Sequence, residues 1–339
     1  MKTLVLGASG YIGQRLMEAM KTTSWLVPIG GSRSRAAALP GVGSDSILVD
    51  TLDAKALATA LEGFDAVVNC VAGDARSISE GARVLAGAAT AAKCPRIIHL
   101  STMSVYGPVE GLVTESSSLD PGLGWYGRAK CDAEEHVAEF VRQGGQAIIL
   151  RPGCVFGTGS ELWVGRVGRW LRTGRLGDLG VGGDGWSNLV NVDDVCQAIM
   201  AALQLPLSAG ELPAFNLAAP DSPRWNDYFV GLAIALGATP VKRIGSSQLR
   251  LDSFIAGPPL KAAQRAMKYI GRSPALPDPI PPGLIRLWAQ HIKLDAAPAS
   301  RKLGIQWTPY GVSMQSCVNW LSGKDATDTH NLSKVICTR

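Results

Sequence analysis

The chain has 339 residues, of which 46% are hydrophobic and 18% are charged, a composition typical of a globular protein with room for one large domain or two lobes. Its mild net charge of +5, with Lys and Arg spread along the chain, gives no indication of a nucleic-acid partner. Seven scattered cysteines without a Cys-x-x-Cys pair indicate neither a metal site nor a disulfide framework, and no apolar run is long enough to cross a bilayer, so we expect a cytoplasmic protein with reduced thiols.

The chain begins with a predicted strand at 2–6, a glycine turn, and a predicted helix at 14–20. The spacing Gly-x-x-Gly-x-x-Gly allows a tight turn and a close approach of backbone to pyrophosphate, and the helix start offers unpaired N–H groups. This context predicts a dinucleotide cradle, and because the turn begins at Gly7 we expect no leader peptide before it. The expected contacts are Gly7, Ser9, Gly10, Tyr11, Ile12 and Gly13.

Strands and helices then alternate up to Pro152. The expected strands are 26–29, 46–49, 66–71, 96–100 and 147–151, and the expected helices are 54–61, 80–92 and 126–143. Each strand is nearly all apolar, which indicates a parallel sheet covered on both faces. Right-handed crossovers make this an α/β fold with a Rossmann-type, doubly wound parallel sheet.

After Pro152 the pattern changes to a smaller, mostly helical lobe. Strands are expected at 189–192 and 213–217, and helices at 195–203, 225–236, 259–270 and 284–292. We expect 1–157 to form the dinucleotide domain with 187–220 returning to it, 158–186 and 221–323 to form the substrate lobe, and 324–339 to form a flexible tail.

Tyr126 and Lys130 form a Tyr-x-x-x-Lys motif at the start of a predicted helix. Positions i and i+4 share one helix face, so we expect Lys130 to lower the pKa of the Tyr126 phenol. A phenol tuned in this way can give or take a proton during hydride transfer. Ser101 and Thr102 end a parallel strand, at the sheet edge where ligands bind, and a hydroxyl there can bind the substrate oxygen.

In these motifs the chain resembles the extended short-chain dehydrogenases/reductases, over roughly residues 1–323. The resemblance implies that Thr102, Tyr126 and Lys130 are catalytic, with Lys130 also holding the nicotinamide ribose. It also implies homodimerisation. The further cofactor contacts that it implies are Asp50 at the adenine, Thr51, Ala72, Gly73, and Pro152 and Val155 beside the nicotinamide. The matching segments are the glycine turn, Val49–Asp53, Ala72–Gly73, Ser101–Gly107, Tyr126 with Lys130, Arg151–Gly157, Asn191–Val195 and Leu303–Pro309.

The second strand gives information on the cofactor. An NAD enzyme places a carboxylate at its end to hold the ribose 2′-hydroxyl, but here that place falls at Gly31 and no Asp or Glu lies between Ser24 and Leu39. Ser32, Arg33 and Arg35 follow instead, and arginine suits a 2′-phosphate. We therefore predict NADP(H) in preference to NAD(H), with Ser32 and Arg33 as contacts and Arg33 as the main one. The alternative is that these arginines are solvated loop charges.

Sequence differences from the nucleotide-sugar enzymes give information on the class of substrate. Cys154 stands where those enzymes usually have Asn, and 187–191 holds no cation. The chain is more similar to the 3β-hydroxysteroid dehydrogenase and dihydroflavonol reductase-like branches. This implies an oxidoreductase that interconverts a carbonyl and an alcohol on a small or medium, partly apolar molecule. The lobe offers aromatic residues for an apolar wall, of which Trp125, Trp163, Trp170, Trp186 and Trp225 are the candidates.

Three questions remain open at this stage. A nucleotide-sugar epimerase, dehydratase or reductase is one alternative; its diphosphate grip would come from Arg166, Arg169, Arg172 and Arg175, or these form a solvated face. A second alternative is a cofactor-sensing protein without turnover.

The basic stripe of Lys261, Arg265 and Lys268 suits a lid, ordinary surface packing or a membrane surface. Asp193 is expected to be structural.

Overall fold

The computed structural model describes residues 1–33, 46–269 and 277–336, so Arg35 lies outside the described residues. The chain divides into two compact units. Unit 1 comprises Met1–Val155, Val190–Pro220 and Leu294–Thr308. Unit 2 comprises Phe156–Leu189, Asp221–Lys293 and Pro309–Arg339. The division lies near the expected boundaries, except that Leu294–Thr308 belongs to unit 1 and not to the substrate lobe.

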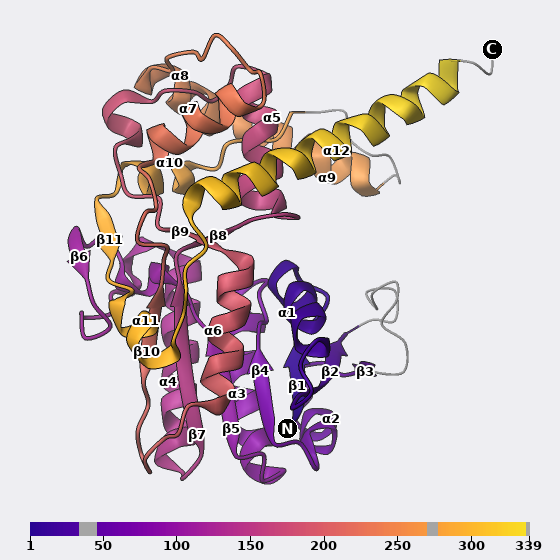
Figure 1. Cartoon of the computed structure of the whole chain (residues 1–339), viewed down its shortest axis with the longest axis vertical. Coiled ribbons are helices and arrows are strands. Elements are labelled where there is room, and N and C mark those ends of the chain that lie inside the picture. The colour runs from indigo at the N-terminus through magenta and orange to yellow at the C-terminus, as the bar shows by residue number, and fades with distance from the viewer. Residues whose placement is uncertain (34–45, 270–276, 337–339) are drawn as a thin grey trace. The chain divides into compact units, whose positions relative to one another are not determined.

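Unit 1 contains a seven-stranded sheet in the order β10-β7-β5-β4-β1-β2-β3, and every neighbouring pair is parallel (Figure 1). The strand order reverses direction beside β1, as in a doubly wound fold, so the expected Rossmann-type sheet is confirmed. The strands are β1 (Lys2–Leu6), β2 (Val27–Ser32), β3 (Ser46–Leu48), β4 (Ala66–Asn69), β5 (Arg96–Leu100), β7 (Gln146–Pro152) and β10 (Ala214–Leu217).

Helices cover both faces of this sheet. Helices α1 (Tyr11–Lys21), α6 (Val192–Gln204) and α11 (Ala297–Leu303) pack on one face. Helices α2 (Ala54–Leu61), α3 (Ala75–Ala91) and α4 (Trp125–Arg142) pack on the other. The α11 residues Ala299 and Leu303 are buried in the same core as α1 and α6, which explains why this late segment belongs to unit 1.

Two helices start earlier than their apolar pattern predicts, because a capping side chain precedes each of them. The Asp74 carboxylate accepts from the Ser77 amide at 2.7 Å, so α3 begins at Ala75 and not at residue 80. The Asn191 side chain accepts from the Asp193 amide at 2.8 Å, so α6 begins at Val192. The start of α3 follows β4 of the seven-stranded sheet, and the start of α6 follows β9 of a separate two-stranded sheet.

Shorter elements complete unit 1 and its junctions with unit 2. The 3₁₀ turns are η2 (Met103–Tyr106) and η3 (Pro121–Leu123), and the short strands are β6 (Gly111–Val113), β8 (Cys154–Phe156), β9 (Leu189–Asn191) and β11 (Ile292–Leu294).

Unit 2 is mostly helical and has an aromatic core. Trp225 stacks on Phe229 at 5.6 Å between ring centroids, and Phe229 meets Trp288 edge-on at 5.2 Å. Trp170 and Trp225 are at most 1% exposed, so these two expected wall residues belong to the core. The elements are η4 (Glu161–Gly165), α5 (Arg166–Arg172), η5 (Gly180–Gly183), α7 (Trp225–Ala235), α8 (Ser246–Arg250), η6 (Leu251–Ala256), α9 (Gly257–Tyr269), α10 (Pro282–Ala289) and α12 (Tyr310–Ile336).

Residues 324–336, which lie in the segment expected to be a flexible tail, continue α12 as a helix. In the part of the chain that the structure describes, no helix is long and apolar enough to span a membrane. Within those same residues, no group of three His, Cys, Asp or Glu side chains is placed to hold a metal ion.

Candidate dinucleotide and active site

The glycine turn is too tightly packed to hold side chains at two of its glycines. Gly7 has φ +77°, and a Cβ there would lie 2.8 Å from the Cys70 carbonyl oxygen. A Cβ on Gly13 would lie 2.2 Å from the Gly7 oxygen, because α1 starts directly against the turn. The Gly10 amide donates to the Gly7 oxygen at 2.9 Å and closes the turn. The turn therefore exposes backbone to a ligand at the start of α1, as a pyrophosphate cradle requires.

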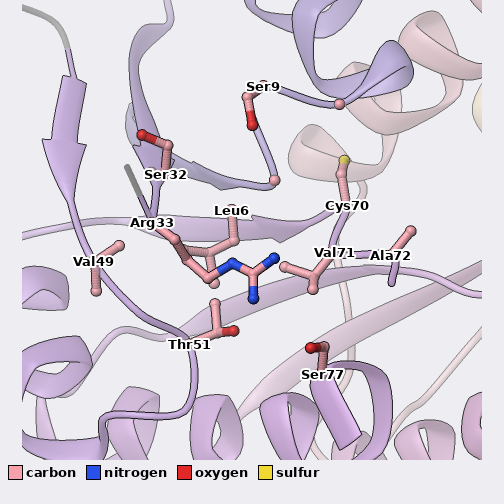
Figure 2. A pocket seen from close by; sticks show the side chains of 13 residues that line it. Leu6, Ser9, Ser32, Arg33, Val49, Thr51, Cys70, Val71, Ala72 and Ser77 are labelled. Atoms are coloured by element: carbon pink, nitrogen blue, oxygen red, sulfur yellow. The ribbon is translucent and has the colours of Figure 1, made fainter. Parts of the chain in front are cut away.

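A pocket of about 170 Å³ opens beside this turn (Figure 2). It contains seven of the predicted contacts, namely Gly7, Ser9, Gly10, Ser32, Arg33, Thr51 and Ala72. The other predicted cofactor residues, Tyr11, Ile12, Gly13, Asp50, Gly73, Pro152 and Val155, do not line it. The lining residues that sequence reasoning missed are Leu6, Gly31, Val49, Cys70, Val71 and Ser77. Ser77 was recognisable in principle, because an Asp three residues before it is a helix-start signal.

Arg33 and Gly31 define the β2 side of the pocket. Figure 2 shows the Arg33 side chain extending into the pocket. Hydrogen bonds from Ser77 are the main cause that lowers the pKa of Asp74, and the charge of Arg33 lowers it further, which places the guanidinium near the start of α3. A Cβ on Gly31 would lie 3.0 Å from Leu6 Cδ2 and 3.3 Å from Val49 Cγ1, so a side chain there would require these neighbours to shift by a small amount.

The Asp50 carboxylate makes a hydrogen bond within its own loop. Its Oδ1 accepts from the Leu52 amide at 3.0 Å, which closes a turn. Its neighbour Thr51 is the one that lines the pocket. The expected contact between Asp50 and the adenine therefore remains a prediction.

Tyr126 and Thr102 meet at the carboxyl end of β5. Tyr126 lies in the first turn of α4, and its phenol lies beside the Thr102 side chain. Burial raises the pKa of Tyr126, and the nearby Thr102 side chain opposes that rise. A Cβ on Gly127 would lie 2.8 Å from the Ser104 oxygen, so this glycine lets α4 pack closely on η2. The structure thus brings together the predicted hydroxyl and the predicted phenol.

Lys130 lies one helical turn behind Tyr126 and is 3% exposed. Its Nζ donates to the Leu100 oxygen at 2.7 Å and to the Val71 oxygen at 3.5 Å. Burial lowers the pKa of Lys130 to about 8, against the opposing effects of Cys70 and Glu134. We expected Lys130 to lower the pKa of Tyr126, and the structure differs: the pKa of Tyr126 is raised, since burial of its hydroxyl dominates.

The Ser101 hydroxyl is engaged by Glu134 and does not join Tyr126 and Thr102 in the site. It donates to the Glu134 carboxylate inside unit 1. Thr102, whose hydroxyl donates to the Ser104 hydroxyl at 3.3 Å, is the strand-end hydroxyl that lies beside Tyr126. Cys154, at the position where sugar enzymes usually have Asn, is 3% exposed, and burial raises the pKa of its thiol.

Two members of the arginine series, Arg169 in α5 and Arg175 after it, make contacts within unit 2. Arg169 pairs with Glu161 and with Asp278, the latter at 2.7 Å. Arg175 pairs with Asp252 and donates to the Asp278 carbonyl oxygen. These pairs account for two of the four cations that a diphosphate grip would use. Of the α9 basic stripe, Lys261 is exposed, and the side chains of Arg265 and Lys268 lie outside the described part of the chain.

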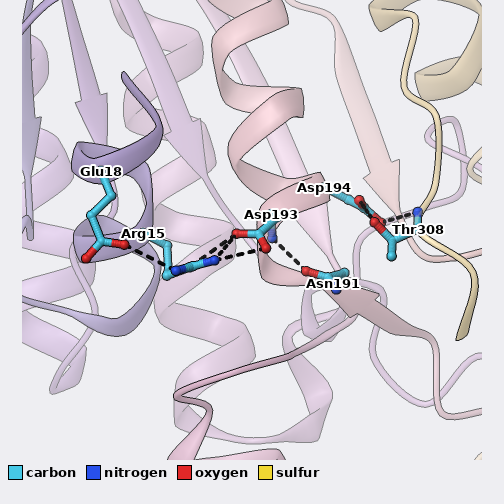
Figure 3. Close-up of polar contacts among 6 residues, drawn as sticks. All are labelled: Arg15, Glu18, Asn191, Asp193, Asp194 and Thr308. Carbon is cyan, nitrogen blue, oxygen red and sulfur yellow. Dashed lines mark hydrogen bonds and ion pairs between the residues drawn. The ribbon is translucent and has the colours of Figure 1, made fainter. Parts of the chain in front are cut away.

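The two aspartates at the start of α6 have structural contacts (Figure 3). Asp193 forms an ion pair with Arg15 of α1, with Nη2 2.8 Å from Oδ1. Asp194 is fully buried and accepts from the Thr308 hydroxyl at 2.6 Å and from its amide at 3.0 Å. The first contact joins α1 to α6, and the second holds the end of the Leu294–Thr308 segment, so both agree with the structural role expected for Asp193.

Comparison with known proteins shows the family of the chain. The sequence model of the NAD-dependent epimerase/dehydratase family matches residues 3–218. Protein YeeZ of Escherichia coli (strain K12) is 28% identical over 300 residues, which cover 83% of this chain and 98% of YeeZ. The 4-hydroxy-2-methyl-3-oxo-4-farnesyl-3,4-dihydroquinoline-1-oxide ketoreductase of Stigmatella aurantiaca is 27% identical over 218 residues, which cover 60% of this chain and 65% of the ketoreductase.

Among solved structures, UDP-glucuronic acid 4-epimerase from Bacillus cereus in complex with UDP-glucuronic acid and NAD superimposes with a TM-score of 0.70. That match has 18% identity and covers 95% of this chain and 99% of the epimerase. The likeness shows a shared fold. Together with the family match, it confirms the expected place among the extended short-chain dehydrogenases/reductases, and the chain belongs to the NAD-dependent epimerase/dehydratase family.

Proposed function

We propose that the protein is an NADP-dependent oxidoreductase that interconverts a carbonyl and an alcohol on a small or medium, partly apolar substrate. The observation that carries this proposal is the placement of the Tyr126 phenol beside the Thr102 side chain, with Lys130 buried one turn behind. A phenol and a hydroxyl held together at a strand end can bind one substrate oxygen from two sides.

The pocket beside the glycine turn fits a dinucleotide. The turn excludes side chains at Gly7 and Gly13, as close contact with a pyrophosphate requires. The choice of NADP rests on Arg33 extending into the pocket and on Gly31, which stands where an NAD enzyme places a carboxylate. The B. cereus epimerase contains NAD. The preference for NADP is therefore proposed from features of this chain alone.

Each residue at the site has a separate role in the proposed reaction. A nicotinamide bound here would supply or accept the hydride. Thr102 orients the substrate oxygen, and Tyr126 gives or takes its proton. Burial raises the pKa of Tyr126, so the phenol holds a proton that it can give to a carbonyl oxygen. Lys130 holds the Leu100 and Val71 carbonyls in place around the site.

The substrate class follows from what the chain offers for binding. Arg169 and Arg175 already have acidic partners, and Cys154 replaces an amide, so a grip on a diphosphate is weakened. The S. aurantiaca relative is named as a ketoreductase of a farnesyl-bearing molecule, which supports a partly apolar ketone as substrate. A homodimer and a cytoplasmic location remain proposals that rest on resemblance and composition.

A panel of ketones, aldehydes, alcohols and nucleotide sugars, followed by absorbance of NADPH and of NADH, tests this function. We expect a net change in NADPH with a carbonyl or alcohol substrate. Epimerisation of a nucleotide sugar with no net change in the dinucleotide would contradict the proposal, and would instead support the epimerase alternative. No turnover across the panel, together with tight dinucleotide binding, would support a cofactor sensor.

A further inference from the structure

A closed ring of hydrogen bonds lies beneath the dinucleotide pocket, at the ends of β4 and β5. Asn69 Oδ1 accepts from the Val71 amide at 3.1 Å, and Asn69 Nδ2 lies 3.2 Å from His99 Nδ1. His99 is followed by Leu100, whose oxygen accepts from Lys130 Nζ at 2.7 Å. Lys130 Nζ also donates to the Val71 oxygen at 3.5 Å, which closes the ring. Val71 lines the pocket, and Lys130 belongs to the helix that carries Tyr126.

The pairing within this ring fixes the protonation of His99. Asn69 uses its oxygen to accept from Val71, so its amide N–H is the group that faces His99. His99 Nδ1 must then be an acceptor, and the proton of the neutral ring lies on Nε2. Burial lowers the pKa of His99, and the nearby charge of Lys130 lowers it further, which agrees with a neutral ring. His99 is 1% exposed, and its Nε2 has no hydrogen-bond partner among the described residues.

The Val71 peptide forms one wall of the ligand pocket. A Cβ on Gly7 would lie 2.8 Å from the Cys70 oxygen, so the glycine turn packs directly against the peptide that precedes Val71. The Cys70 amide donates to the Leu6 oxygen at 3.0 Å, which ties the same segment to β1. The Val71 amide donates a hydrogen bond to Asn69, and the Val71 oxygen accepts one from Lys130. Rotation of the Asn69 side-chain amide would break the first of these two hydrogen bonds.

We propose that His99 is a positioning residue for the dinucleotide site: as the acceptor that fixes the Asn69 amide, it holds the Val71 wall and links that wall to the Lys130 helix. The proposal rests on the dinucleotide role of the pocket and is independent of the choice between NADP and NAD and of the substrate. Its consequence is that an acceptor atom at the Nδ1 position, rather than an imidazole as such, is what residue 99 must supply.

Three substitutions separate this role from simple packing. In His99→Asn the side-chain oxygen occupies nearly the place of Nδ1 and keeps the acceptor. In His99→Gln the oxygen lies farther out, near the place of Nε2. His99→Phe fills the volume without any acceptor. We expect H99F and H99Q to weaken binding of both NADPH and NADH about tenfold, because the Asn69 amide loses a buried partner. We expect H99N to remain within about threefold of the wild type.

The binding constants are measured by isothermal titration calorimetry, with His136→Phe on α4 as the matched control, expected to bind like the wild type. Equal affinities for H99N and H99F, or wild-type affinity for H99F in a folded protein, would overturn the proposal. Failure of the wild type to bind either dinucleotide would instead reject the role of the pocket itself.

A measurement on the unaltered protein keeps the proposal testable if a variant fails to fold. Long-range ¹H–¹⁵N spectra of histidine-labelled protein report which ring nitrogen carries the proton. We expect His99 to be the neutral Nε2-protonated tautomer from pH 5 to pH 8. This is roughly the range in which an ordinary histidine titrates. A proton on Nδ1, or a charged ring at neutral pH, would overturn the assignment of His99 as the acceptor.

Discussion

The guanidinium of Arg151 and the carboxylate of Glu134 form an ion pair inside unit 1, with Nη2 2.6 Å from Oε2 and side chains that are 7% and 5% exposed. Arg151 also donates to the Tyr106 hydroxyl at 3.0 Å, and Tyr106 donates to Asn216 at 2.7 Å. Glu134 lies one turn after Lys130 on α4. The pair therefore fixes the helix that carries Tyr126 and Lys130 to β7, η2 and β10.

Removing the charge of Glu134 should destabilise unit 1 strongly. Glu134→Gln leaves the Arg151 guanidinium buried without a counter-ion, and breaking a buried pair in this way costs about 3–5 kcal/mol. Urea denaturation measures the loss in free energy of unfolding. The control is Glu139→Gln, which breaks an exposed pair with Arg142 and should cost far less stability, because solvent screens an exposed pair. Similar losses for the two variants would contradict the structural role of the buried pair.

Alanine at Gly13 should destroy the dinucleotide cradle. A Cβ there would lie 2.2 Å from the Gly7 oxygen, so the turn and the start of α1 must move apart. We expect dinucleotide affinity to fall by about 100-fold or more, measured by titration calorimetry. The control is Gly87→Ala in α3, where nothing lies within 4 Å of the added Cβ. That change should stabilise the protein by about 0.5–1 kcal/mol and leave affinity unchanged. Tight binding by G13A would reject the turn as the cradle.

Arg33 should set the preference between the two dinucleotides. Arg33→Ala removes the only cation that lines the described pocket, so the KM for NADPH should rise about tenfold while the KM for NADH stays within about twofold. Arg83→Ala, which removes an exposed arginine of α3, is the control and should change neither constant. An equal effect of R33A on both dinucleotides would mean that Arg33 does not recognise the 2′-phosphate.

Lys130 should make stability depend on pH in the alkaline range. Its pKa is about 8 in the folded protein against an ordinary value of 10.5. Between these values the unfolded chain binds a proton that the folded chain has released, so stability rises with pH through this window. The full gain is on the order of 3 kcal/mol. Lys130→Met lacks the titrating group, so the wild type should gain stability relative to K130M from pH 8 to pH 10.5. A constant difference between the two denaturation curves would contradict the lowered pKa.

Local sequence patterns predicted most of unit 1. The glycine turn, the apolar strands and the Tyr126–Lys130 spacing each follow from chemistry within a few residues, and the structure has them in the expected order. Helix starts were predicted less well, because the caps Asp74 and Asn191 lie outside the apolar pattern that identified α3 and α6.

Long-range packing accounts for the remaining differences. The pKa of Tyr126 depends on burial of its hydroxyl, which spacing along one helix does not reveal. Asp278, which pairs with Arg169, and Asp252, which pairs with Arg175, lie 109 and 77 residues away in sequence, so these contacts cannot be recognised until the chain is folded. The same holds for His99, whose contact with Asn69 joins two strands across 30 residues.

The central claim is that Tyr126 transfers the proton in a hydride-transfer reaction, and Tyr126→Phe tests it most directly. The change removes the phenol hydroxyl and keeps the ring. With NADPH and the best carbonyl substrate of the panel, we predict a loss of about 100-fold or more in kcat, while the Kd for NADPH stays within about twofold. Turnover by Y126F at the wild-type rate, with NADPH still bound, would contradict the account.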